Sequence, residues 1–361
     1  MLKYIVKRLS LSVLILFGVS VIIYGLIRIK PGLDFIEAKY YSQLQQDSTG
    51  EVRKMVERQR EIYGLTSPIL QGYFKWLSNI LQGEWGNSFI FTINTGELEY
   101  LVDANGQPIL DGQGNQLTRA VSSSNVLDII ATKSQISFII ALIATVFQFL
   151  IAIPLGVISA TKQYGIVDYT VAILAMTGIS LPSFFFGAFL LRLFSIQLGW
   201  FPYAGLTDPN SGLPPFWDKV HHLVLPLTVL IILSIGGLMR YTRTNMLEVM
   251  NADYIRTARA KGLSEHKVIY RHAFRNTLIP LVTIFAGILP SLFGGAMITE
   301  TIFSIDGIGK AAYKAVTQGD IPFVMAYNLF LALLTVIGTL LSDIMYAVVD
   351  PRVKLTGGTR G

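Results

Sequence analysis

The feature that most constrains this chain is a series of long stretches without charged side chains, of which Ile136–Ala160 is the clearest. A helix needs about 20 mostly apolar residues to cross the hydrocarbon core of a bilayer, and backbone in lipid must satisfy its own hydrogen bonds. The chain is 52% hydrophobic and only 14% charged, against roughly 25% charged residues in soluble domains. We therefore expect an all-α integral membrane protein, which excludes a cytosolic enzyme and a nucleic-acid-binding protein.

Six stretches are long enough, or nearly so, to form spanning helices. The first is too long for the core of a signal peptide and has no small-residue cleavage site after it, so we expect a permanent anchor. Six spans put both termini on one side. The short loops on that side are several times richer in Lys and Arg, which places both termini in the cytoplasm. The expected spans are Leu9–Ile27, Ile136–Ala160, Tyr169–Leu191, Leu223–Met239, Thr277–Ile298 and a segment from about Met325 to Val349.

These spans predict four parts of the chain. Residues 1–29 form the anchor, residues 30–125 lie outside the cytoplasm, residues 126–349 form a five-helix core, and residues 350–361 form a cytoplasmic tail. Within the outer part, Glu51–Leu65 and a segment from Ser67 to about Leu81 favour helices. The Asn105-Gly106 pair, between alternating apolar and polar residues, predicts a small β-hairpin.

The prolines and glycines within the spans are compatible with two arrangements of the helices. Pro154, Pro182, Pro226 and Pro290 lie inside them, as do several glycines. Small residues and prolines occur where helices pack closely, and also where bent helices line a passage. We favour close packing for any single position, and a tightly packed bundle for the whole set.

The sequence shows no motif for nucleotide hydrolysis or proteolysis. It has no Cys, and the adjacent His221 and His222 would point about 100° apart on a helix, which makes a poor metal pair. Gly307–Lys310 ends like a phosphate-binding loop, but the first Gly of that motif is missing and Ala follows the Lys, so we interpret it as a turn. Asp343, inside the last span, is either a functional group or the partner of a basic residue at the membrane surface.

The largest cytoplasmic loop, residues 244–276, predicts two short helices. Asn251 is expected to cap the first helix, which has Asp253 in its first turn. Gly262 stands where a residue in the left-handed conformation would end that helix, and Ser264 is expected to cap the next one.

One face of the first loop helix carries Tyr254, Ile255 and Ala258, and the remainder is basic. A short exposed helix with an apolar edge fits a groove on a partner protein. A basic loop lying against anionic lipid explains the same residues. These residues are compatible with both interpretations.

Several ordered motifs carry a resemblance to a known family. The loop resembles the cytoplasmic "EAA" loop of binding-protein-dependent ABC importers, in its dipeptide/oligopeptide permease version, although Arg256 and Thr257 stand where the general pattern has Glu and Ala. The resemblance covers nearly the whole chain except about residues 91–122, which look like an insertion. The segments that carry it are Tyr63–Leu65, Gln71–Trp76, Ile153–Val157, Ser180–Phe184, Leu198–Pro202, Asp253–Leu263, Arg271–Pro280, Glu300–Ser304, Gly307–Gly309 and Asp350–Arg352.

The resemblance implies a type I ABC importer permease fold with six transmembrane helices and an extracytoplasmic insertion after the first. It implies a passive subunit of the cell (inner) membrane that forms the translocation path for peptides, without a cofactor of its own. ATP and Mg²⁺ would bind to partner subunits. The implied partners are a second homologous permease, two ABC ATPase subunits, an extracytoplasmic substrate-binding protein and membrane lipid, with no nucleic acid.

Two groups of residues are assigned roles through the resemblance. The residues expected to couple to the ATPase are Asp253, Tyr254, Ile255, Arg256, Ala258, Arg259, Lys261 and Gly262, and those expected along the translocation path are Gln148, Ser180 and Ser183. The alternative role for the three path residues is hydrogen bonding between helices, and we favour this alternative.

Two other functions remain to be weighed. An ion-coupled secondary transporter would need buried carboxylates near the middle of the membrane, and the expected spans offer almost none. A membrane-embedded enzyme would need a nucleophile or a metal pair facing a cavity, and no such group is recognisable. The transported molecule stays open, because related permeases carry nickel chelates or sugars.

Overall fold

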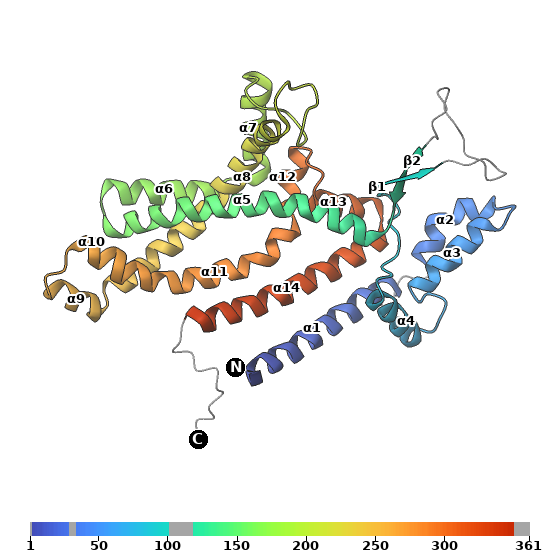
Figure 1. Ribbon diagram of the computed structural model, residues 1–361, viewed down its shortest axis with the longest axis horizontal. Helices are drawn as coiled ribbons and strands as arrows, with labels where there is room; N and C mark the ends of the chain where they lie inside the picture. The colour runs from blue at the N-terminus through green and yellow to red at the C-terminus, as the bar shows by residue number, and fades with distance from the viewer. Residues whose placement is uncertain (1, 29–33, 101–117, 350–361) are drawn as a thin grey trace. The chain divides into compact units, whose positions relative to one another are not determined.

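The computed structural model describes residues 2–28, 34–100 and 118–349, which are mainly helical (Figure 1). They also contain one pair of strands and a long connection without helix or strand at residues 198–214. The chain divides into two compact units. Unit 1 is built from Met1–Ser12, Ser134–Ala311 and Leu333–Gly361, and unit 2 from Val13–Lys133 and Ala312–Ala332.

Within the described residues, four helices are long and apolar enough to span a membrane, and a bent helix pair would make a fifth span. The segment expected as another span is helical as α11 (Arg275–Gly294). The number of six therefore stays a prediction. The four long helices are α1 (Leu2–Arg28), α5 (Val126–Thr161), α8 (Pro215–Met250) and α14 (Ile321–Val349).

The expected third span, Tyr169–Leu191, is not one continuous helix. It is α6 (Ile166–Ser180) followed by α7 (Ser183–Leu190) and the π-helical segment η1 (Leu191–Gln197), with a bend of 99°. Leu181 and Pro182 adopt extended backbone, with ψ of 123° and 129°. Proline disfavours helical backbone in the residue before it and cannot donate a helix hydrogen bond, which explains a break at this position.

The expected fifth span, Thr277–Ile298, extends four residues past the end of the helix that the structure shows. Helix α11 stops at Gly294, because Gly295 takes φ 76°, a region that residues with a Cβ rarely adopt. A Cβ on Gly295 would also lie 2.5 Å from the backbone nitrogen of Gly309. The chain then turns into α12 (Met297–Ile302).

A buried carboxylate organises the turn before α13 (Ile308–Gln318). Glu300 accepts the Ser137 hydroxyl at 2.7 Å, and its other oxygen accepts the backbone N–H of Lys310 at 2.8 Å. A Cβ on Gly307 would lie 2.6 Å from that carboxylate, so the glycine is needed for close approach. The segment Gly307–Lys310 is thus a turn that leads into a helix around an acid of its own chain.

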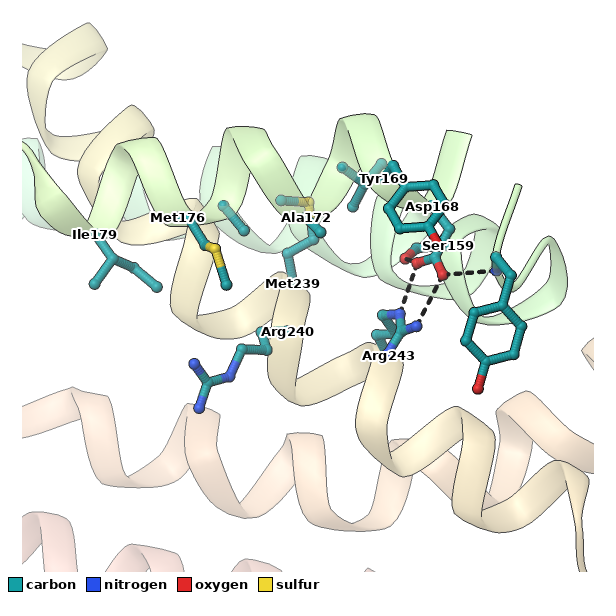
Figure 2. Close-up of a pocket in the computed structure, with 12 residues that line it drawn as sticks. Ser159, Asp168, Tyr169, Ala172, Met176, Ile179, Met239, Arg240 and Arg243 are labelled. Atoms are coloured by element: carbon teal, nitrogen blue, oxygen red, sulfur yellow. Dashed lines mark hydrogen bonds and ion pairs between the residues drawn. The ribbon is translucent and has the colours of Figure 1, made fainter. Parts of the chain in front are cut away.

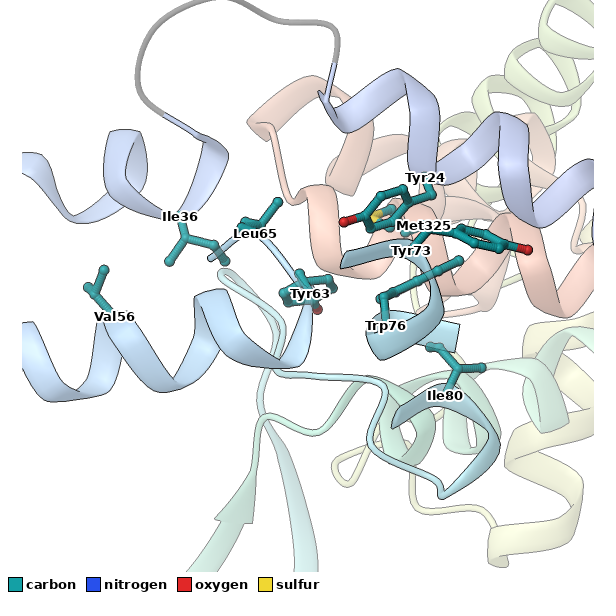
Figure 3. Close-up of a cluster of buried hydrophobic side chains, with 9 residues drawn as sticks. All are labelled: Tyr24, Ile36, Val56, Tyr63, Leu65, Tyr73, Trp76, Ile80 and Met325. Carbon is teal, nitrogen blue, oxygen red and sulfur yellow. The ribbon is translucent and has the colours of Figure 1, made fainter. Parts of the chain in front are cut away.

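Unit 2 has an aromatic core, which we call the aromatic cluster (Figure 3). It joins α1 to α2 (Phe35–Gln45), α3 (Glu51–Ile62) and α4 (Ile69–Leu81). The Tyr24 hydroxyl donates to the Gly64 carbonyl at 3.2 Å, and Ser20 and Tyr73 share a hydrogen bond of 2.7 Å. The buried members of the aromatic cluster are Tyr24, Ile36, Val56, Tyr63, Leu65, Tyr73, Trp76, Ile80 and Met325.

Unit 2 also contains a fully buried acid, Asp320, just before α14. Its carboxylate accepts the Ser88 hydroxyl and the backbone N–H groups of Phe89 and Phe323, at 2.5, 3.1 and 3.2 Å. These bonds satisfy a charge that burial would otherwise penalise, and they tie the segment before α5 to the start of α14.

The two strands, β1 (Ile93–Tyr100) and β2 (Thr118–Ser123), pair antiparallel, with Ile93 opposite Ser123 and Tyr100 opposite Thr118. The pairing is interrupted between Asn94 and Leu98. The Asn105-Gly106 turn expected from the sequence lies outside the described residues.

Candidate functional site

The loop expected to contact a partner folds as α9 (Asp253–Ala260), α10 (Glu265–Lys267) and the π-helical segment η2 (Val268–Phe274). The expected cap at Asn251 is wrong. Helix α8 continues to Met250, so Asn251 ends α8, and its side-chain amide donates to the Leu247 carbonyl at 3.0 Å. The residue before α9 is Ala252, which offers no side-chain cap.

The end of α9 follows the sequence prediction at Gly262, which has φ 75°. Its N–H donates to the Arg259 carbonyl at 2.9 Å, and the next N–H, of Leu263, donates to the Ala258 carbonyl at 3.4 Å. This pair of bonds satisfies carbonyls that a helix end leaves open. Ser264 precedes α10 as expected, but its side chain makes no capping bond.

The apolar residues of α9 pack against their own chain. The exposed fraction is 0% for Ile255 and 7% for Ala258, whereas Tyr254 is 47% exposed. The expectation of one exposed apolar edge is therefore wrong for Ile255 and Ala258. We call the core that contains them the loop cluster, and its buried members are Val157, Ala160, Met246, Ile255, Ala258, Val268 and Ala273.

The outer face of α9 is polar and carries Tyr254. Arg256 lies 3.8 Å from the Asp253 carboxylate, and Arg259 donates twice to Glu265, at 2.8 and 3.3 Å. The remaining residues expected at this face, Lys261 and Gly262, are exposed as well. Six of the eight expected coupling residues thus share an accessible surface, and the other two hold it in place.

A network that the sequence analysis did not identify lies beside the loop cluster (Figure 2). Asp168, at the start of α6, is buried and accepts two bonds from Arg243 of α8, at 2.7 and 2.8 Å. It also accepts the Ser159 hydroxyl of α5 and the backbone N–H of Tyr164. The sequence contains one sign of this network. Asp168 lies just before one apolar stretch and Arg243 just after another, and both stretches are expected to end at the same membrane surface.

This network fixes three helices at one end. Tyr164 takes φ 60°, which is uncommon for a residue with a side chain, and its N–H is thereby placed on Asp168. Ser159 lies between Val157 and Ala160 of the loop cluster along α5, and Arg243 lies about one turn before Met246 on α8. The network therefore joins the ends of α5, α6 and α8, and two of these helices, α5 and α8, contribute to the cluster that buries α9.

A groove of about 290 Å³ runs along α6 beside the network. Its lining is mainly apolar. Ser159, Asp168 and Arg243 gather at one end, and Arg240 lies apart from them (Figure 2). The lining residues are Ser159, Tyr164, Asp168, Tyr169, Val171, Ala172, Ala175, Met176, Ile179, Met239, Arg240 and Arg243.

The residues expected along the path are not gathered into one site by this chain alone. The Gln148 amide donates to the Ser234 carbonyl at 3.0 Å. This bond joins α5 to α8, which is the alternative role, hydrogen bonding between helices. Ser180 and Ser183 lie on either side of the bend at Leu181–Pro182, one exposed and one half-buried. Their role in transport stays a prediction.

Asp343 of α14 pairs with Arg8 of α1, with 2.9 Å between Arg8 Nη1 and Asp343 Oδ2. This geometry fits the second interpretation of the acid, a partner for a basic residue near the end of a span. The pair joins the first and last long helices within unit 1.

Comparison with known proteins gives consistent matches. Residues 152–355 match the family of the binding-protein-dependent transport system inner membrane component. The oligopeptide transport system permease protein AppB of Bacillus subtilis is 35% identical over 354 residues, covering 98% of this chain and 100% of AppB. The di/tripeptide transport system permease protein DppB of Pseudomonas aeruginosa is 33% identical over 374 residues, covering 98% and 99%.

Among solved structures, an inward-facing form of the MetNI methionine ABC transporter matches with a TM-score of 0.50 and 15% identity. It covers 63% of this chain and 99% of that one. At this identity the likeness concerns the fold, and it confirms the expected type I importer permease fold.

Proposed function

Because the chain belongs to the family of inner membrane components of binding-protein-dependent transport systems, we propose that it forms part of the translocation path of an ATP-driven peptide importer. Two relatives named for oligopeptide and di/tripeptide transport match over nearly their whole length, which supports peptides as the cargo. Members of this family are permease subunits that are not catalytic. ATP and Mg²⁺ would therefore act on separate partner subunits, and this chain would move in response.

The mechanical observation that supports coupling is the position of α9. Its inner face, Ile255 and Ala258, packs on residues of α5 and α8, so a push on α9 displaces both helices together. A loop without such packing would absorb the movement. The direction of transport must come from contacts that differ between ATP-bound and ATP-free states, because equal contacts shift no conformational equilibrium.

The docking face follows from which residues are exposed. Tyr254 supplies an aromatic side chain, and Arg256 and Lys261 supply charge, on the side of α9 away from the loop cluster. Aromatic residues and arginine carry a large share of binding energy at protein interfaces. We assign the contact with an ATPase subunit to this face, with Ile255 and Ala258 as its support.

The remaining partners follow from the family and the expected orientation. An extracytoplasmic binding protein would deliver peptide to the side opposite α9. A second, homologous permease would complete the path, since the predicted path residues of this chain do not form an enclosed site together. Both termini would lie in the cytoplasm of a cell whose inner membrane holds the complex.

The test uses the complete importer, reconstituted with its ATPase subunits, second permease and binding protein. Tyr254→Ala should weaken ATPase co-purification about tenfold and reduce ATP-dependent peptide uptake, since a central aromatic contact contributes over 1 kcal/mol. The control is Tyr270→Ala, an equally exposed tyrosine of the same loop outside α9.

Three results would overturn the proposal. The docking face is wrong if Tyr254→Ala and Arg256→Glu both bind the ATPase normally. The ATP-driven mechanism is wrong if uptake persists with an inactive ATPase and stops when ion gradients are collapsed. The peptide assignment is wrong if a peptide library fails to compete for uptake.

A further inference from the structure

The groove along α6 has a shape suited to an elongated apolar ligand. The residues that α6 contributes run from Asp168 to Ile179, which is about 16 Å of helix. Ala172 and Ala175 leave room on this wall, and Met176 and Met239 provide flexible apolar surface. The lining is therefore apolar over most of its length.

The groove carries a surplus positive charge on Arg240. Asp168, the acid in the lining, is occupied by Arg243, Ser159 and the N–H of Tyr164. Arg240 is exposed, and its guanidinium has no ion pair or hydrogen bond within the described part of the chain. Figure 2 shows it directed away from the Asp168–Arg243 pair.

The position of these charges along the helices matches a membrane surface. Arg240 is the first charged residue after the uncharged stretch Leu223–Met239 of α8, and Asp168 directly precedes the uncharged stretch Tyr169–Leu191. Two apolar stretches thus end at the same place, where hydrocarbon gives way to headgroups. The exposed Tyr164 and Tyr169 at this end have the amphipathic rings typical of that boundary.

We propose that this groove is a binding site for one anionic phospholipid, with an acyl chain along α6 and the headgroup phosphate on Arg240. An apolar slot beside an unpaired cation complements a molecule with an apolar tail and a negative head. Basic pockets between membrane helices bind anionic headgroups for the same reason. A guanidinium also presents paired N–H donors that fit phosphate oxygens.

The site has a consequence for the proposed coupling. The lipid would contact Met239 and Arg240 on α8 and the wall of α6, next to the Asp168 network that supports α9. Binding would hold α6 and α8 in one spacing. The lipid site itself does not depend on peptide being the cargo or on which side α9 faces.

The experiment measures lipid retained by the purified intact complex. The complex is incubated in detergent with phosphatidylglycerol or with phosphatidylcholine of the same acyl chains, washed, and examined by native mass spectrometry. We expect about one phosphatidylglycerol per chain to be retained, at least fivefold more than phosphatidylcholine. Arg240→Gln should remove this preference, and Ala172→Phe should reduce retention of both lipids by filling the groove.

Matched variants separate the site from general charge attraction. Lys162→Gln removes an exposed cation of the α5–α6 turn that does not line the groove, and should leave retention unchanged. Arg240→Lys should restore part of the preference. Thermal unfolding of each variant shows whether its fold is intact.

Three outcomes would overturn the proposal. Equal retention of the two lipids would show an apolar groove without headgroup recognition. Equal losses for Lys162→Gln and Arg240→Gln would show surface attraction only. Retention by the isolated chain but not by the intact complex would show that a helix of a partner subunit covers the groove.

Discussion

The aromatic cluster of unit 2 and the loop cluster of unit 1 are both apolar cores between helices, but they are built from different side chains. The aromatic cluster centres on Tyr24, Tyr73 and Trp76, whose rings lie 5.4 to 6.2 Å apart. The buried members of the loop cluster are all Ala, Val, Ile or Met. Large rings lose much contact on truncation, whereas closely packed small side chains tolerate little added volume or charge.

The difference suggests different tasks for the two clusters. Aromatic packing and hydroxyl bonds to backbone stabilise a fixed arrangement of α1 to α4. The loop cluster brings α9 against α5, about a hundred residues earlier in the chain, and against the end of α8, which suits transmission of movement. We therefore expect mutations in the aromatic cluster to act on stability, and mutations in the loop cluster to act on coupling.

The largest effect is expected for Trp76→Ala. Trp76 is 1% exposed, and removing a buried tryptophan costs about 3–5 kcal/mol. The thermal midpoint of the purified complex, followed by far-ultraviolet circular dichroism, should fall, with little assembled protein recovered. Phe74→Ala, on the exposed side of the same helix, is the control and should behave like wild type. A Trp76 variant of normal stability would contradict the assigned role of the aromatic cluster.

Ala258→Glu tests the loop cluster. The glutamate would be forced into a packed apolar site without a partner, at a cost on the order of 3 kcal/mol to the packing of α9. We expect faster tryptic cleavage at Arg256 and Arg259 and at least tenfold lower uptake, while the overall thermal midpoint changes little. Ala260→Glu, at an exposed position of the same helix, should leave both unchanged. Equal behaviour of the two variants would show that the inner face of α9 has no special role.

Asp168→Asn is expected to have an intermediate effect. The pair with Arg243 is buried on the aspartate side and 28% exposed on the arginine side. We expect a cost of about 1–3 kcal/mol, between the values for exposed and buried pairs. The informative measurement is peptide transported per ATP hydrolysed, which should fall if the network holds the helix ends together. Glu248→Gln removes an exposed acid of α8 and serves as the control. An unchanged ratio would limit Asp168 to a structural role.

The sequence predicts features that depend on local residues. Span positions follow from the length of apolar stretches, and the end of α9 follows from Gly262, because only the preceding turn decides whether a left-handed residue fits there. The break at Leu181–Pro182 was harder to predict, since proline also occurs within continuous membrane helices, as Pro154 and Pro226 do.

Features that depend on distant partners were not predictable from one sequence. Ile255 and Ala258 look like an exposed edge of a short helix, because the residues that bury them include Val157 and Ala160, about a hundred positions earlier. The same applies to Asp168 and Arg243, which are 75 residues apart. Each member has an ordinary local setting, and only the packing of α5, α6 and α8 brings them together.

The smallest effect is expected for Tyr73→Phe, which separates hydroxyl bonds from ring packing in the aromatic cluster. The variant keeps the ring and loses the 2.7 Å bond with Ser20 of α1. A typical hydrogen bond within a protein contributes about 0.5–1.5 kcal/mol net, so the thermal midpoint should fall only slightly. A double-mutant cycle with Ser20→Ala isolates the pair. A coupling energy near zero would leave ring packing as the source of stability, whereas one above about 1.5 kcal/mol would exceed the usual range and show that the hydroxyls position α1 on α4.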